Sequence, residues 1–237
     1  MSPKRSTLNG TWELSYGRSV PGGPSDPAEL TGQGWPTVAA KVPGNVELDL
    51  IRAGVLPELS VGNRIYELLP YERYEWWYRR SFTAPLAGPG EQVHLVFEGI
   101  DCLGTVWVNG VRVGATDNML IPHRFDVTGL VRSGADNELV VRLAPAVAAG
   151  DQGELDPVCF AFPGNHASLT VRKAPHMYGW DIMPRVVTAG LWREVALELV
   201  PAVHWRSVYW GVRATDPDRR TATVHLIWDF AVHPGSV

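Results

Sequence analysis

The chain has 237 residues, of which 45% are hydrophobic and 19% are charged, a balance that excludes disorder as its main state. Its 21 Lys and Arg against 25 Asp and Glu give a net charge of −4, so it lacks the basic excess that binding to nucleic acid requires. No apolar run approaches the ~20 residues of a membrane span, and residues 1–10 are too polar for a secretory signal. We therefore expect a cytoplasmic protein without nucleic-acid or membrane partners, in which Cys102 and Cys159 stay reduced.

Short strands are expected along most of the chain, because apolar and polar residues alternate with a period of two between turn residues. Helix is scarce. The best candidate is 45–53, with Asn45 as N-cap and Gly54 as the stop, and a second helical turn is expected over 68–73. The expected strands, in chain order, are 10–16, 75–84, 91–99, the two halves of 105–113, 123–128, 137–144 and 192–200.

The strongest local signal is Asn109-Gly110, which lies between two Val-rich runs. Asn and Gly both tolerate the positive φ of a type I′ turn, so the pair predicts a tight β-hairpin. Many short strands separated by turns predict an all-β protein, an antiparallel sandwich of the jelly-roll or immunoglobulin-like type.

A domain boundary is expected near Pro201. Residues 1–200 read as a nearly complete sandwich, and 203–237 read as the incomplete first strands of a second, immunoglobulin-like β-domain. The two strands expected at 204–212 and 221–230 cannot bury both faces alone, so the chain looks like part of something larger. Their exposed edge makes a homodimer through 204–230 a second possibility.

Between residues 145 and 191 the strand pattern lapses, and a segment of that length without regular structure is usually functional. The segment is rich in aromatic and polar side chains that could contact a ligand: Phe160, Phe162, His166, His176, Tyr178, Trp180 and Asp181.

The sequence contains no GxSxG, Walker A or GxGxxG motif, and its seven His show no HxH or HExxH spacing. No cofactor and no metal site is therefore expected. A glycosidase could still assemble carboxylates in space, and the candidates are Glu98, Asp101, Asp126, Asp156 and Asp181.

For most of these carboxylates a structural role is expected. Glu98 and Asp101 flank a strand end and would cap backbone N–H groups, and Asp126 would be a structural residue or a partner of Arg124. Trp180-Asp181 is different, because an indole face and a carboxylate on a loop suit a sugar's C–H face and its hydroxyls. The alternative is a structural one, in which Asp181 pairs with Arg172 or Arg185.

The segment 171–195, VRKAPHMYGWDIMPRVVTAGLWREV, resembles family 2 glycoside hydrolases of the β-mannosidase type. The family pattern has an Arg-Lys pair, then Gly-Trp-Asp, Pro-Arg and Thr-x-Gly-x-Trp-Arg. Further segments resemble the family in the same order, so that the likeness covers essentially the whole chain: 42–57, 75–82, 97–110, 123–128 and 137–143. Ile182-Met183 depart from the pattern, which usually reads Trp-Asp-Trp-Gly-Pro-Arg here.

The resemblance implies a jelly-roll, galactose-binding-like sandwich followed by immunoglobulin-like domains and a TIM barrel. In that family the two catalytic glutamates of a retaining glycosidase belong to the barrel, so this chain is expected to hold no catalytic residue and to be inactive alone. The single Asn-Glu pair, Asn137-Glu138, begins a strand. The resemblance further implies that Trp180, Asp181 and Arg185 bind a β-linked mannoside or related sugar within a larger enzyme. A free-standing carbohydrate-binding module and a purely structural domain are the alternatives.

Overall fold

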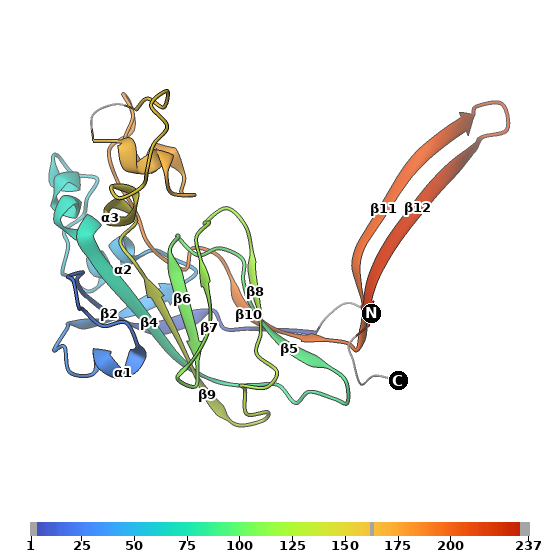
Figure 1. The fold of residues 1–237 in the computed structure, drawn as a ribbon, viewed down its shortest axis with the longest axis horizontal. Helices are drawn as coiled ribbons and strands as arrows, with labels where there is room; N and C mark the ends of the chain where they lie inside the picture. The colour runs from blue at the N-terminus through green and yellow to red at the C-terminus, as the bar shows by residue number, and fades with distance from the viewer. Residues whose placement is uncertain (1–3, 162–163, 233–237) are drawn as a thin grey trace.

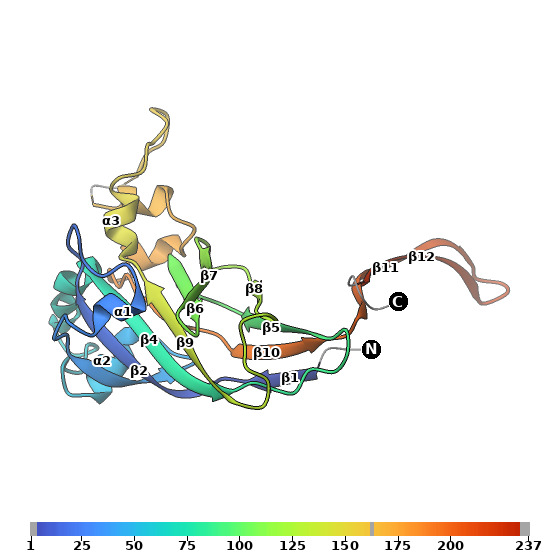
Figure 2. The same ribbon diagram turned by 60° about the horizontal axis from the view of Figure 1, so that its bottom comes forward.

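The computed structural model describes residues 4–161 and 164–232, in which two antiparallel sheets form a sandwich (Figures 1 and 2). The six-stranded sheet has the order β3 (Thr37–Val42), β2 (Gly10–Arg18), β4 (Tyr74–Thr83), β9 (Asp136–Leu143), β6 (Gly104–Val108) and β7 (Val111–Thr116). The four-stranded sheet has the order β1 (Lys4–Thr7), β10 (Val195–Val200), β5 (Gln92–Phe97) and β8 (His123–Asp126).

The core lies between the two sheets, because alternate residues of each strand point inward. Leu14, Tyr78 and Val141 from one sheet and Leu95 and Leu197 from the other are at most 1% exposed and belong to one cluster. The predicted all-β sandwich is confirmed. The two cysteines are unpaired as expected: Cys102 is buried, and Cys159 is exposed.

Two local predictions are confirmed in detail. Asn109 and Gly110 both have positive φ, 51° and 79°, in the turn between β6 and β7. Helix α2 (Val46–Arg52) begins after Asn45, whose side chain accepts a hydrogen bond of 3.1 Å from the Leu48 N–H. Gly54, with φ of 72°, follows its end.

Several elements were not predicted. The edge strands β1 and β3 and helix α1 (Pro27–Leu30) were missed, and the helical turn expected at 68–73 is the end of a longer 3₁₀ helix, η1 (Arg64–Arg73). The segment 145–191 contains short helices at α3 (Ala146–Gly150), η2 (His166–Leu169) and η3 (Pro175–Tyr178). Phe162 lies outside the described residues. No helix within 4–161 or 164–232 is long and apolar enough to cross a membrane.

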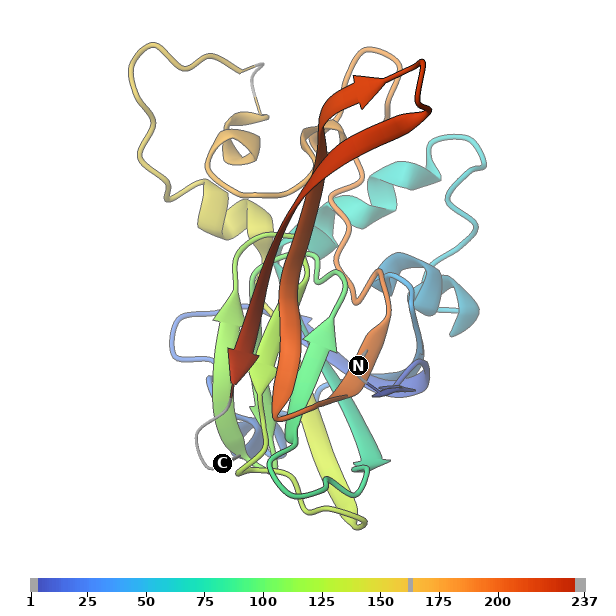
Figure 3. The ribbon, with the colours of Figure 1, turned by 90° about the vertical axis from the view of Figure 1, so that its right-hand side faces the viewer.

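These short helices gather at one end of the sandwich. Figures 1 and 3 show η1, α3 and the connections that follow α3 beside one another at the upper end of the sheets. The polypeptide therefore brings residues from three separate parts of the chain to one surface.

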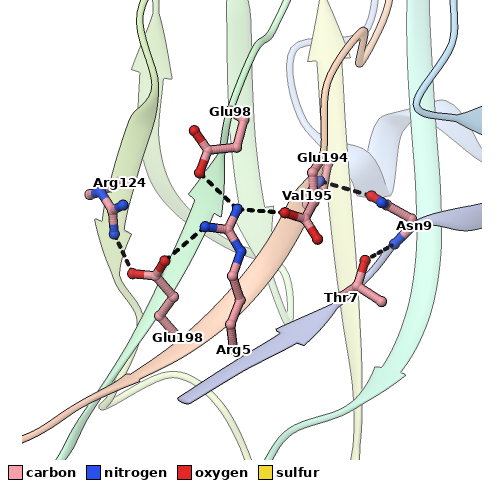
Figure 4. Close-up of polar contacts among 8 residues, drawn as sticks. All are labelled: Arg5, Thr7, Asn9, Glu98, Arg124, Glu194, Val195 and Glu198. Atoms are coloured by element: carbon pink, nitrogen blue, oxygen red, sulfur yellow. Dashed lines mark hydrogen bonds and ion pairs between the residues drawn. The ribbon is translucent and has the colours of Figure 1, made fainter. Parts of the chain in front are cut away.

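A cluster of charges covers part of the outer face of the four-stranded sheet (Figure 4). Arg5 of β1 contacts Glu98 at 2.7 Å, Glu194 at 2.8 Å and Glu198 at 3.1 Å. Glu198 also forms an ion pair with Arg124 of β8. Because Glu198 is buried and belongs to β10, these pairs tie the N-terminal strand to the sheet.

The last two strands, β11 (Val203–Asp216) and β12 (Thr221–Val232), form a hairpin that projects away from the sandwich (Figures 1 and 2). Among the residues of these two strands only Ala231 is buried. Cross-strand pairing places a row of exposed apolar side chains on one face, namely Trp205, Val208, Trp210, Val212, Val224, Leu226, Trp228 and Phe230.

Candidate functional site

A buried ion pair fixes the segment after η2 to the sandwich. The Lys173 ammonium and the Asp101 carboxylate contact each other with their side chains 0% and 3% exposed. Lys173 Nζ also donates to the Thr188 carbonyl at 2.6 Å, and the Thr188 hydroxyl donates to Asp101 Oδ2 at 2.7 Å. Three residues far apart in sequence thus share one hydrogen-bonded cluster, which holds both ends of the segment 173–188.

Glu47 of α2 lies near this pair and is itself buried. Burial raises its pKa to about 8, while the Lys173 charge partly opposes that rise and the Asp101 charge adds to it. The side chain is therefore protonated at neutral pH in the folded protein, whereas it is ionised in the unfolded chain.

This pKa difference predicts a pH dependence of stability. Between pH 4.5 and pH 8 the folded state binds a proton at Glu47 that the unfolded state has released, so stability falls as the pH rises through this window. The variant Glu47→Gln should flatten that slope and raise the free energy of unfolding at pH 8 above that of the parent chain. Urea denaturation at several pH values measures this, and an unchanged slope would contradict it.

A second ion pair braces the segment from its other side. The Arg185 guanidinium binds the Glu72 carboxylate of η1 through two hydrogen bonds, Nε at 2.6 Å and Nη2 at 2.8 Å. Its Nη1 donates to the carbonyls of Gly164 at 3.0 Å and Tyr178 at 3.3 Å, and the guanidinium lies 5.5 Å from the centre of the Tyr178 ring. Because two parallel hydrogen bonds join the groups, the pair fixes both the distance between Arg185 and Glu72 and the orientation of the guanidinium.

Close packing holds the end of the segment. The Trp192 indole lies so near Gly99 that a Cβ there would come within 2.5 Å of its ring nitrogen, so glycine is required. The same ring N–H donates to the Met119 carbonyl at 3.2 Å, and Arg193 stacks on the ring at 4.1 Å. The Thr-x-Gly-x-Trp-Arg motif therefore serves attachment to the sandwich.

Between these attachments the chain makes a tight turn. The Trp180 N–H donates to the Met183 carbonyl at 3.0 Å and the Met183 N–H donates to the Trp180 carbonyl at 3.2 Å, which leaves Asp181 and Ile182 at the tip. Trp180 is 61% exposed and Ile182 is 87% exposed. We call residues 180–183 the tip turn.

The tip turn borders an open depression of about 760 Å³, whose other walls are Ile65 and Tyr66 of η1, Asn165 and Tyr178. A second depression, of about 390 Å³, lies between Trp180 and the exposed ring of Phe160. The surface around the tip turn is thus hollowed and apolar while still open to solvent.

The three predicted sugar-binding residues are close together in sequence but differ in surroundings. Trp180 and Asp181 lie on the tip turn, and Arg185 lies behind it in the pair with Glu72. Within the described residues Asp181 forms no side-chain hydrogen bond or ion pair, so the structural alternative, a pair with Arg172 or Arg185, is not observed. Sugar contact by any of the three stays a prediction.

The other candidate carboxylates have local structural roles, but two differ from those expected. Asp101 pairs with Lys173, and Glu98 pairs with Arg5, so the expectation that their side chains cap backbone N–H groups was wrong. Asp126 accepts hydrogen bonds from Thr128, and Asp156 accepts one from the Val158 N–H at 3.0 Å.

The sequence reasoning missed Glu72 as the partner of Arg185. Glu72 lies 113 positions earlier in the chain, within an unremarkable run of charged and aromatic residues, and no spacing rule connects the two. Lys173 was noted only as part of a motif, because a lysine in a polar segment gives no sign that it is buried.

The sandwich, with a projecting loop segment attached at one end, defines a galactose-binding-like domain. Residues 23–193 match the family model described as glycosyl hydrolase 2 galactose-binding domain-like, and the chain belongs to this family. The hairpin of β11 and β12 lies outside the matched residues.

The chain is also similar to curated proteins. It is 34% identical over 163 residues to β-mannosidase B of Thermothelomyces thermophilus, covering 68% of this chain and 19% of that protein. It is 34% identical over 180 residues to β-mannosidase B of Aspergillus terreus, covering 75% and 21%. The chain thus matches about a fifth of the length of these relatives.

Solved structures agree with this assignment. The β-D-mannosidase of Dictyoglomus thermophilum matches 97% of this chain and 26% of its own, with 29% identity and a TM-score of 0.78. A β-glucuronidase of Bifidobacterium dentium matches 98% of this chain and 37% of its own, with a TM-score of 0.60. Because the two are only 21% identical, this match supports the fold alone.

Proposed function

We propose that this chain is the non-catalytic N-terminal domain of a β-mannosidase-like glycoside hydrolase, and that its tip turn completes the sugar pocket of a catalytic barrel outside this chain. Support comes from relatives named β-mannosidase, of which the chain matches about a fifth. The substrate of the whole enzyme would be a β-linked mannoside or a related sugar.

The geometry of the tip turn is the observation that carries this proposal. Two ion pairs and a close-packed tryptophan attach the segment, yet its most projecting residues, Asp181 and Ile182, contribute little to that attachment. A rigidly braced turn that presents an indole and a carboxylate suits recognition, since preorganisation lowers the entropy lost on binding.

In the proposed pocket the Trp180 indole stacks on the C–H face of the sugar, and the Asp181 carboxylate accepts hydrogen bonds from its hydroxyls. Arg185 remains part of the proposed site, but its contacts with Glu72 and Tyr178 favour a positioning role behind the turn over direct sugar contact. Exclusion of water by the barrel would strengthen the bonds to Asp181.

The same proposal includes a domain boundary at residues 200–203. The apolar face of the hairpin would be covered by further strands of an immunoglobulin-like domain that begins at residue 203, because an exposed apolar patch of this kind indicates an interface. A homodimer through 204–230 is the competing proposal, and light scattering separates the two: a monomeric mass would count against the dimer.

A cytoplasmic location also belongs to the proposal. The exposed thiol of Cys159 and the unpaired, buried Cys102 are compatible with a reducing compartment. Detection of the protein in cell fractions would test the location directly.

The isolated chain should not hydrolyse aryl β-mannosides, because the proposal places both catalytic glutamates outside it. It should also bind free sugar at the tip turn only weakly, in the millimolar range, because one open wall leaves each hydroxyl half in water. Turnover that a point change within the chain abolishes would contradict the first expectation. A micromolar dissociation constant by calorimetry that Asp181→Ala weakens would instead favour a free-standing carbohydrate-binding module.

A further inference from the structure

A separate depression lies on the outer face of the six-stranded sheet. Its volume is about 260 Å³, and it is formed by β2, β3, β4, β9, the end of α1 and the loop that follows α1. None of its lining residues belongs to the tip turn or to the segment that carries it. We call it the sheet depression.

Tryptophans form the apolar part of the sheet depression. Trp77 and Val140 are buried, and Trp77 stacks on Trp107 with ring centres 5.5 Å apart. Trp35, which is half-buried, packs against Gly17 of β2, where a Cβ would lie 2.2 Å from the indole. Because Gly17 has no side chain, the Trp35 indole lies directly on the backbone of β2, and this contact fixes the position of the ring.

The loop that carries Trp35 is held in place before any ligand arrives. Asp26 caps α1 by accepting a hydrogen bond of 2.9 Å from the Ala28 N–H, and Glu29 accepts one of 2.8 Å from the Ser25 N–H. The Pro36 carbonyl accepts a bond of 3.2 Å from the Tyr16 N–H of β2. The aromatic wall is thus preorganised, which favours binding.

Side chains of negative and positive charge line the remaining wall of the sheet depression. Glu13 of β2 lies directly opposite Arg79 of β4, yet the Arg79 guanidinium donates to Glu138 at 3.1 Å. Within the described part of the chain, the Glu13 carboxylate has no ion pair and no hydrogen bond. Beside it, the hydroxyls of Ser15 and Thr37 lie 2.7 Å apart. The depression therefore offers an unpaired acceptor, guanidinium donors and two hydroxyls around an indole.

We propose that the sheet depression is a second sugar-binding site, which takes one neutral hexopyranose ring independently of the tip turn. The Trp35 indole faces the C–H surface of the ring, Glu13 accepts bonds from hydroxyls, and Arg79 donates to hydroxyl oxygens. Opposite charges side by side favour a neutral polyol over an ion of either sign. The depression is small, about 260 Å³, which favours a single ring over a longer glycan.

The test is an NMR titration of the whole 237-residue chain with methyl β-D-mannopyranoside, following the indole N–H of Trp35. We expect a saturable shift with a millimolar dissociation constant. Glu13→Gln, which keeps the shape and removes the charge at an exposed position, should weaken binding about ten-fold. Trp35→Phe should weaken it by a smaller factor, because a smaller ring keeps the apolar wall.

Asp181→Asn is the matched control, since it changes a carboxylate at the tip turn and should leave the Trp35 titration unchanged. Absence of a saturable shift at Trp35, or equal affinity for the parent chain, Glu13→Gln and Trp35→Phe, would overturn the proposal. Loss of the shift in Asp181→Asn would assign binding to the tip turn and would overturn it as well. If the tip turn proves not to bind sugar, the shift expected at Trp35 in this titration would be unaffected, so the two proposals are tested separately.

Discussion

Asp181→Ala in a full-length enzyme carrying this domain should lower kcat/KM for an aryl β-mannoside by about ten- to hundred-fold for each hydrogen bond lost, because a bond to a charged acceptor contributes ~1.5–3 kcal/mol. The melting temperature should hardly change, since within the described residues the Asp181 side chain forms no hydrogen bond or ion pair. Steady-state kinetics and thermal unfolding on the same variant measure both quantities.

Asp218→Ala provides the matched control for this experiment. Asp218 is an exposed carboxylate in the turn between β11 and β12, and its loss should change neither kcat/KM nor the melting temperature. An Asp181→Ala variant with unchanged kcat/KM and a lowered melting temperature would show that Asp181 is structural.

The largest effect on stability is expected at the buried ion pair. Asp101→Asn removes the charge that balances Lys173 in a site where both side chains are at most 3% exposed. Removing one partner of such a pair costs about 3–5 kcal/mol, because the remaining charge stays buried without compensation. Urea denaturation should therefore show a clearly lower midpoint for this variant.

The double variant Asp101→Asn with Lys173→Met separates this cause from a general packing defect. Removing the second charge as well should recover most of the lost stability, since a buried pair and an apolar replacement are often of similar stability. A single variant within about 1 kcal/mol of the parent chain would contradict the account of this pair.

Much of the sandwich could be predicted from local patterns. The Asn109-Gly110 turn and helix α2 follow from backbone chemistry that acts over a few residues, and both are as expected. The edge strand β3 was missed because its sequence, TVAAKV, is small and mixed, and its strand form depends on pairing with β2. Tertiary pairing rather than propensity decides such strands.

The candidate site could be predicted in part. The Trp180-Asp181 motif marks the position of the tip turn. The turn is held in place, however, by Glu72, which pairs with Arg185 113 positions later, and by Asp101, which pairs with Lys173 72 positions later. Arg172 and Arg185 are candidate partners of Asp181 on the sequence alone, because they lie near it in the chain. Arg185 instead pairs with a carboxylate that the fold brings alongside it, and such a choice depends on tertiary structure.

A crystal structure of the full-length enzyme with a mannose-derived inhibitor in its catalytic pocket tests directly whether the tip turn completes that pocket. We predict that the Asp181 carboxylate lies within ~3.2 Å of a sugar hydroxyl and that the Trp180 indole packs against the ring. A tip turn that points into solvent, or that contacts the barrel without touching the inhibitor, would contradict the proposed role of Trp180 and Asp181 in sugar binding.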